Sequence, residues 1–196
     1  MAPVLILTLI ILGIIVCEHR NLYVAVASLL IQNVILLILL FYGSVSIFTV
    51  IFSAISLVIV IPLIIFLTIS KTKSYSEEPF IDGLTSISIL IFLISISTAY
   101  AILNSLSLKM LLFLSLLIIG VYMMIVKADL IKLGLGLSLV NNATHILTMG
   151  VEIPILADVS LTIVKIFTIS LIMGLAVGLY NKTGSLDIRK LTLLRW

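Results

Sequence analysis

Two apolar stretches near the end of the chain carry polar side chains at helical spacing. The polar stripes are Ser138, Asn141 and His145 in the first stretch and Asp158, Thr162 and Lys165 in the second. Members of each stripe are three or four residues apart, so they share one face of a helix. Amine, imidazole and carboxyl groups take up and release protons, and the chemistry that these stripes predict is proton or cation transfer.

The short segment 150–154 joins the two stretches, which predicts that their helices are antiparallel neighbours. At about 1.5 Å per residue, Lys165 lies roughly 15 Å from that turn, and Asn141 lies within one helical turn of the same depth. We therefore expect the stripes to face each other near the middle of a membrane. The candidates for a proton pathway are Lys165, His145, Asn141 and Asp158.

Lys165 is the most informative of these candidates. An ammonium at the centre of a bilayer costs about 2.5–3.5 kcal/mol, so the side chain is expected to face protein or water. Two interpretations stay open. Lys165 is either a titratable group on an ion path or a structural lysine paired with a carboxylate of this chain or of a partner. Asp158 is either that carboxylate or a solvated acid near the outer surface, and His145 is either a proton relay or a packing residue.

Other kinds of site are excluded by the composition. A lone Cys17 rules out an internal disulfide, a cysteine-ligated cluster and a cysteine-rich zinc site. His19 and His145 are expected roughly 20 Å apart in depth, which is too far for a shared haem. Gly134 and Gly136 lie in an apolar helix and cannot form a phosphate-binding loop. We expect no cofactor, no metal and no catalysis by this chain alone.

The elements that position these residues must be membrane helices. Of the 196 residues, 63% are hydrophobic and 10% are charged, and the mean hydropathy is +1.45, which no soluble core of this size could accommodate. Cutting the sequence at charged and turn residues leaves seven apolar runs. They span residues 2–17, 22–42, 45–70, 84–103, 106–126, 130–149 and 155–180. The predicted fold is all-α, a polytopic membrane protein with seven transmembrane helices.

Basic residues between these runs predict the orientation in the cell membrane. Nine lie on one side and only Lys109 on the other, with Lys165 left out as part of a span. The nine are Arg20, Lys71, Lys73, Lys127, Lys132, Lys182, Arg189, Lys190 and Arg195. Because positive charges near span ends are retained inside, the N-terminus is predicted outside and the C-terminus in the cytoplasm. The pI near 9.1 therefore reflects topology and predicts no nucleic-acid partner.

The predicted organisation is a four-helix N-terminal unit (1–104), a three-helix unit (105–182) and a cationic amphipathic tail (183–196). No internal repeat is evident in the sequence. Pro62 is expected to kink the third run, because it removes a backbone hydrogen bond. Gln32 and Asn33 in the second run are expected to connect helices, and Gly174 and Gly178 indicate a close helix contact.

Two segments resemble the hydrogenase-4 component E family, which are membrane subunits of group 4 hydrogenase and formate hydrogenlyase complexes. The matching positions are Leu130-Ile131-Lys132, Gly136, Leu139, Asn142, Thr144 and His145, then Thr183 to Ile188, Leu191-Thr192 and Leu194. The last three runs are also similar to the K subunit of complex I and the C subunit of Mrp-type antiporters. This chain departs from the family at Asn141, where a glutamate is usual, and at Lys165, where an aspartate or small residue is usual. The family's lysine ahead of the proline falls here on an apolar stretch around Leu57.

The resemblance implies a membrane-arm subunit of a complex I-like, hydrogenase-type assembly, lining or bracing a proton or sodium path coupled to electron transfer elsewhere. The implied partners are antiporter-like and other membrane subunits, with lipid around them. The tail is expected to dock on hydrophilic cytoplasmic subunits or on lipid headgroups. Two alternatives remain, a purely structural scaffold in that complex and a stand-alone, homo-oligomeric ion transporter.

Overall fold

The computed structural model describes residues 3–42, 47–77, 81–149 and 154–189, and most of these residues are helical. The elements are α1 (Pro3–Glu18), α2 (Leu22–Tyr42), α3 (Ile47–Ser53), the π-helix η1 (Ala54–Val60), α4 (Ile61–Thr72), α5 (Gly83–Leu103), α6 (Leu108–Val126), α7 (Leu130–Thr148) and α8 (Ile155–Thr183). No strand occurs in these ranges, so the predicted all-α class is confirmed. The tail residues 190–196 lie outside the described residues.

Five helices are long and apolar enough to cross a membrane. They are α2, the continuous helix 47–72 formed by α3, η1 and α4, then α5, α6 and residues Leu156–Thr183 of α8. Large apolar side chains such as Leu84 and Leu156, 79% and 80% exposed, cover their outer faces. Such a surface is incompatible with water, which supports a membrane protein. α1 is a shorter apolar helix, and α7, which carries Lys132 and the polar stripe, is not among the five.

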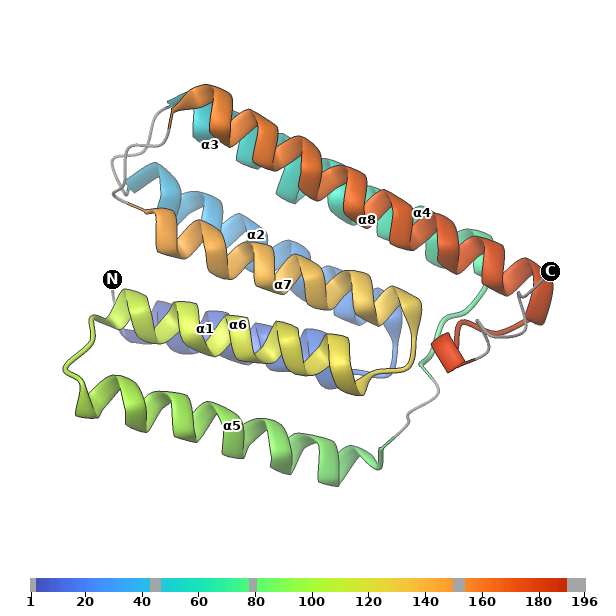
Figure 1. Ribbon diagram of the computed structural model, residues 1–196, viewed down its shortest axis with the longest axis horizontal. Helices are drawn as coiled ribbons and strands as arrows, with labels where there is room; N and C mark the ends of the chain where they lie inside the picture. The colour runs from blue at the N-terminus through green and yellow to red at the C-terminus, as the bar shows by residue number, and fades with distance from the viewer. Residues whose placement is uncertain (1–2, 43–46, 78–80, 150–153, 190–196) are drawn as a thin grey trace.

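The helices form two rows of three that lie against each other (Figure 1). One row contains α1, α2 and the helix 47–72, and the other contains α6, α7 and α8. α1 packs on α6, α2 on α7 and α4 on α8, while α5 lies at the edge against α6. At one end of this bundle, α1, α4, α6 and α8 end and α2, α5 and α7 begin. We call it the charged end, because Arg20, Lys71, Lys127 and Lys182 lie there.

The two rows are a structural repeat, which the sequence did not reveal. After α4, Ser76 forms an antiparallel bridge with Asn21, the residue before α2; after α8, Asp187 forms the same bridge with Asp129, the residue before α7. Two backbone hydrogen bonds flank each bridge in the same pattern, Leu22 N to Tyr75 O and Glu77 N to Arg20 O in the first, Leu130 N to Leu186 O and Ile188 N to Ala128 O in the second. We call residues 3–77 the N-terminal repeat and residues 108–188 the C-terminal repeat.

Helix ends also correspond between the repeats. Asn21 and Asp129 each accept hydrogen bonds from the first backbone N–H groups of α2 and α7. α4 and α8 each end at a residue in the left-handed conformation, Lys73 (φ 50°) and Gly184 (φ 66°). Both repeats run in the same direction, as the colours of Figure 1 show. Each repeat consists of three antiparallel helices, so it ends at the opposite end of the bundle from where it begins. α5 brings the chain back to the first end, where the second repeat begins.

α6 and α7 pack with their backbones in close contact. A Cβ on Gly120 would lie 2.8 Å from the carbonyl oxygen of Gly136, and one on Gly136 would lie 2.9 Å from that of Gly120. Small residues permit such backbone approach in membrane helices. Gly174 and Gly178, the pair expected to make a close contact, have no atom within 4 Å of a Cβ. The close contact in the described chain is therefore made by other glycines.

Gly120→Ala is expected to lower the free energy of unfolding by about 1–3 kcal/mol, because the added methyl group meets backbone atoms that cannot move aside. Gly174→Ala is the matched control and should be neutral or raise that energy by up to about 1 kcal/mol through helix propensity. Unfolding of the purified chain by denaturing detergent in mixed micelles measures both. Equal values for the two variants would contradict the tight α6–α7 contact.

Candidate functional site

The structure brings Lys165 and His145 together across α7 and α8. The ammonium Nζ of Lys165 lies 3.2 Å from Nε2 of His145. His145 is buried and Lys165 is partly buried. Asn141 lies one turn away on the same face of α7, and its buried Nδ2 has no hydrogen-bond partner. The predicted antiparallel pairing of the two helices is therefore observed, and their polar stripes meet at the pair Lys165 and His145.

Asp158 does not join this contact. It is buried in the first turn of α8, two helical turns from Lys165, and the two side chains form no ion pair. Lys165 therefore contacts another base and not an acid within the described residues. Such a pair can hold one proton on either nitrogen, which is the geometry that a relay requires.

Buried amides connect the two repeats near the middle of α2 and α7. Asn142 Nδ2 donates to Asn33 Oδ1 at 2.7 Å and to Gln32 Oε1 at 3.2 Å. Gln32 Nε2 in turn donates to the carbonyl oxygen of Leu9 in α1 at 3.0 Å. All three amides are at most 1% exposed. Gln32 and Asn33 thus connect helices as expected, and their position is the interface of the repeats.

Asn33 also supplies a hydrogen bond that the backbone of the helix 47–72 lacks. In η1 each N–H bonds the carbonyl five residues back, as Ile61 N does to Ser56 O. The next residue is Pro62, which has no N–H, so the carbonyl of Leu57 loses its donor. Asn33 Nδ2 supplies that donor at 2.6 Å. Pro62 therefore removes a backbone hydrogen bond as expected. The π-helix precedes it, and Asn33 from α2 replaces the missing donor at Leu57.

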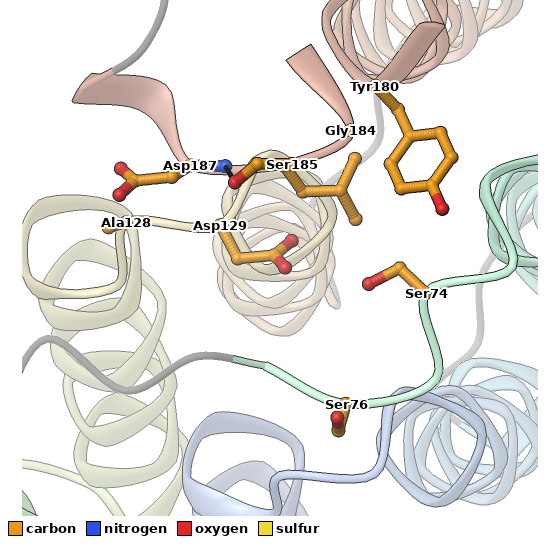
Figure 2. Close-up of a pocket in the computed structure, with 9 residues that line it drawn as sticks. Ser74, Ser76, Ala128, Asp129, Tyr180, Gly184, Ser185 and Asp187 are labelled. Atoms are coloured by element: carbon orange, nitrogen blue, oxygen red, sulfur yellow. Dashed lines mark hydrogen bonds between the residues drawn. The ribbon is translucent and has the colours of Figure 1, made fainter.

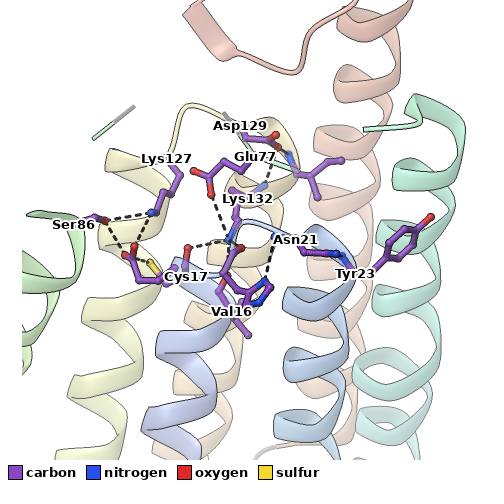
Figure 3. Close-up of polar contacts among 12 residues, drawn as sticks. Val16, Cys17, Asn21, Tyr23, Glu77, Ser86, Lys127, Asp129 and Lys132 are labelled. Atoms are coloured by element: carbon purple, nitrogen blue, oxygen red, sulfur yellow. Dashed lines mark hydrogen bonds and ion pairs between the residues drawn. The ribbon is translucent and has the colours of Figure 1, made fainter. Parts of the chain in front are cut away.

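A second polar cluster lies at the charged end (Figure 3). Lys132 is completely buried, and its Nζ donates to the carbonyl oxygens of Val16, Cys17 and His19 at 2.9, 2.9 and 2.8 Å. Its carboxylate partner is Glu77, at 3.5 Å. The last carbonyls of a helix have no donor within the helix, so Lys132 caps the C-terminus of α1 from α7.

Lys127 forms the other half of this cluster. Its Nζ lies 3.0 Å from Glu18 Oε2 and donates to Ser86 Oγ at 3.2 Å. Ser86 donates to Glu18 at 2.8 Å and lies 2.8 Å from the hydroxyl of Tyr122. Burial alone would lower the pKa of Lys127, but the surrounding negative charges, Glu77 first, outweigh burial, so its pKa is raised. These contacts tie α1, α5 and α6 together.

Sequence reasoning missed this cluster because charges beside span ends resemble solvated loop residues. In the sequence, Lys127 and Lys132 indicate only the orientation of the chain, and Glu77 lies in a polar break between two apolar runs. One signal was available. Lys132 lies inside the apolar helix that begins after Asp129, one turn from its start, where a lysine facing the bundle needs an acid or carbonyl oxygens.

Asp129, the N-cap of α7, faces a small cavity of about 70 Å³ (Figure 2). Burial raises the pKa of its carboxyl to about 6, against the hydrogen bonds from Ile131 and Lys132 N–H, which lower it. The folded chain therefore keeps a proton that the unfolded chain releases. Ionisation of Asp129 consequently lowers the stability as the pH rises from 3.8 to about 6.

No family model matches this chain, and no curated protein and no solved structure matches it. The resemblance to hydrogenase-4 component E therefore stays an expectation. No group of three or more His, Cys, Asp or Glu side chains that could hold a metal ion occurs in the described ranges.

Proposed function

We propose that this chain is a membrane subunit of a complex I-like, hydrogenase-type assembly and that it lines or braces a proton or sodium path. The observation that carries the proposal is the contact of Lys165 with His145 between apolar helices. An ammonium beside a second base, with no acid in contact, is energetically unfavourable in a membrane. A role in ion transfer would explain why the chain has it there.

The proposed topology has seven crossings, with the N-terminus outside and the charged end in the cytoplasm of the cell. α1 and α7 occupy the same places in their repeats as α6 and α2, which are long enough to cross. Lys127 and Lys132 are buried in ion pairs, but the other described cations at the charged end lie opposite Lys109. They are Arg20, Lys71, Lys73, Lys182 and Arg189. This asymmetry supports the orientation.

A stand-alone ion transporter is the second candidate, and the repeat favours it. Transporters are often built from internal repeats with the ion site near the midplane, at the interface of the repeats. The amides of Gln32, Asn33 and Asn142 have that position here. Purification of the tagged full chain separates the two candidates. Copurifying antiporter-like and redox subunits support the assembly, whereas ion transport by the chain alone in liposomes supports the transporter.

Lys165→Met is expected to reduce ion translocation by membrane vesicles at least about tenfold, because methionine cannot hold the proton. His145→Gln, which retains a polar side chain but does not titrate, should produce a similar loss. Lys71→Met, which removes an exposed lysine at the charged end of α4, is the matched control. Chain abundance in the membrane should be the same in all three variants. Wild-type turnover and translocation in Lys165→Met would show that the pair is only a scaffold.

A further inference from the structure

Comparison of the two repeats identifies one charge, on Asp129, that the fold does not require. Asn21 and Asp129 occupy equivalent positions and cap α2 and α7 through the same side-chain oxygen, Oδ1. The amide of Asn21 shows that a neutral side chain performs this capping in the same backbone setting. The carboxylate of Asp129 therefore needs another explanation, especially because it is only 6% exposed and burying a charge is unfavourable.

The carboxyl group of Asp129 points into the cavity at the charged end (Figure 2). Oδ1 accepts both capping hydrogen bonds, at 2.7 and 3.3 Å, whereas Oδ2 forms no hydrogen bond or ion pair with the described chain. The nearby cations are engaged elsewhere. Lys132 binds Glu77 and the end of α1, and Arg189 binds Asp187. The carboxylate lacks a counterion in contact.

Oxygen atoms from both repeats line this cavity. Ser74 and Ser76 come from the segment after α4, and Tyr180, Ser185 and Asp187 come from the end of α8 and the segment after it. The hydroxyl group of Ser74 points toward Asp129, and that of Tyr180 lies at the edge of the cavity, beyond Ser74 (Figure 2). Neither hydroxyl forms a hydrogen bond with the described chain. The volume of about 70 Å³ leaves room for a small ion together with water.

We propose that this cavity binds one hard monovalent cation of the size of Na⁺, held by Asp129 Oδ2 and the hydroxyl oxygen of Ser74, with water completing the shell and connecting it to the hydroxyl of Tyr180. All the donors are oxygen atoms, which suit a hard ion. Only one uncompensated carboxylate faces the cavity, which matches a single positive charge, whereas calcium sites use several carboxylates and six to eight ligands.

Equilibrium binding of radioactive Na⁺ to the purified full chain in lipid nanodiscs tests the site. Wild type should bind close to one ion per chain, and Asp129→Asn, which retains the cap as Asn21 does, should weaken binding at least about tenfold. Ser74→Ala and Tyr180→Phe should each weaken it by a smaller factor. Asp82→Asn is the matched control, because Asp82 caps α5 at the same end of the bundle without facing this cavity, and its binding should equal wild type.

Three results would overturn the assignment. They are the absence of saturable Na⁺ binding in wild type, equal binding by Asp129→Asn, and displacement of Na⁺ by K⁺ at equal concentration. Gel filtration of each variant shows whether it is folded, so that a loss of Na⁺ binding is not mistaken for unfolding. The assay needs neither partner subunits nor ion transport, so its outcome is independent of the role proposed for Lys165.

Discussion

Lys132→Met is expected to destabilise the folded chain by about 3–5 kcal/mol, which would remove most of the folded protein from the membrane. The substitution leaves the carboxylate of Glu77 buried without its cation and leaves the carbonyls of Val16, Cys17 and His19 without donors. Methionine fills nearly the same volume, so the loss reports the polar contacts and not a cavity. Unfolding in mixed micelles and the yield of monodisperse chain are the measurements.

The double variant Lys132→Met/Glu77→Gln separates the cost of the unpaired carboxylate from that of the carbonyls without donors. Neutralising Glu77 should recover part of the stability, while the loss from the three carbonyls at the end of α1 should remain. Lys73→Met, which removes an exposed lysine at the same end, should leave the stability within about 0.5 kcal/mol of wild type. A Lys132→Met variant as stable as wild type would refute the capping of α1 by α7.

Asn33→Ala is expected to have the second-largest effect on stability, a loss of about 2–4 kcal/mol. It removes the donor to the carbonyl of Leu57 and the acceptor of Asn142, both inside the membrane part of the bundle. Asn104→Ala is the matched control, because Asn104 lies exposed at the opposite end and bonds only its own helix. Its stability should stay close to wild type in the same unfolding assay.

Pro62→Ala provides a sharper test in the Asn33→Ala background. Alanine restores the N–H that η1 lacks, so the carbonyl of Leu57 regains a backbone donor and part of the stability should return. In the wild-type background the same change should gain much less, because Asn33 already fills that role. Additive effects of the two substitutions would show that Asn33 and Pro62 act independently, against the proposed compensation.

The sequence was sufficient for the features that depend on periodicity. The helices, their apolar faces and the meeting of the stripes around His145 and Lys165 all follow from spacing along single helices. The π-helix could not be predicted, because it depends on a donor, Asn33, from another helix. The burial of Lys127 could not be predicted either, since a lysine beside a span end looks the same whether it faces water or a carboxylate. Lys132 differs, because its place inside the apolar helix α7 was a usable signal.

The repeat was missed for a different reason. It is preserved in backbone pairing and in helix ends, where residue identity matters little. Asn21 and Asp129 perform one capping role with different side chains, and Lys73 and Gly184 adopt one left-handed conformation. Apolar positions facing lipid accept many residues, so the sequence of one repeat need not recur in the other. The candidate cation site, which exists only where the two repeats meet, was invisible for the same reason.

Because α5 reverses the path once, the two halves of the molecule are related by a shift and not by an inversion, and both experience a membrane voltage with the same sign. Midway along its helices the N-terminal repeat has the uncharged residues Pro62 and Asn33, whereas the C-terminal repeat carries Lys165 inside α8. The same architecture is thus built in one repeat around neutral side chains and in the other around a lysine and an imidazole.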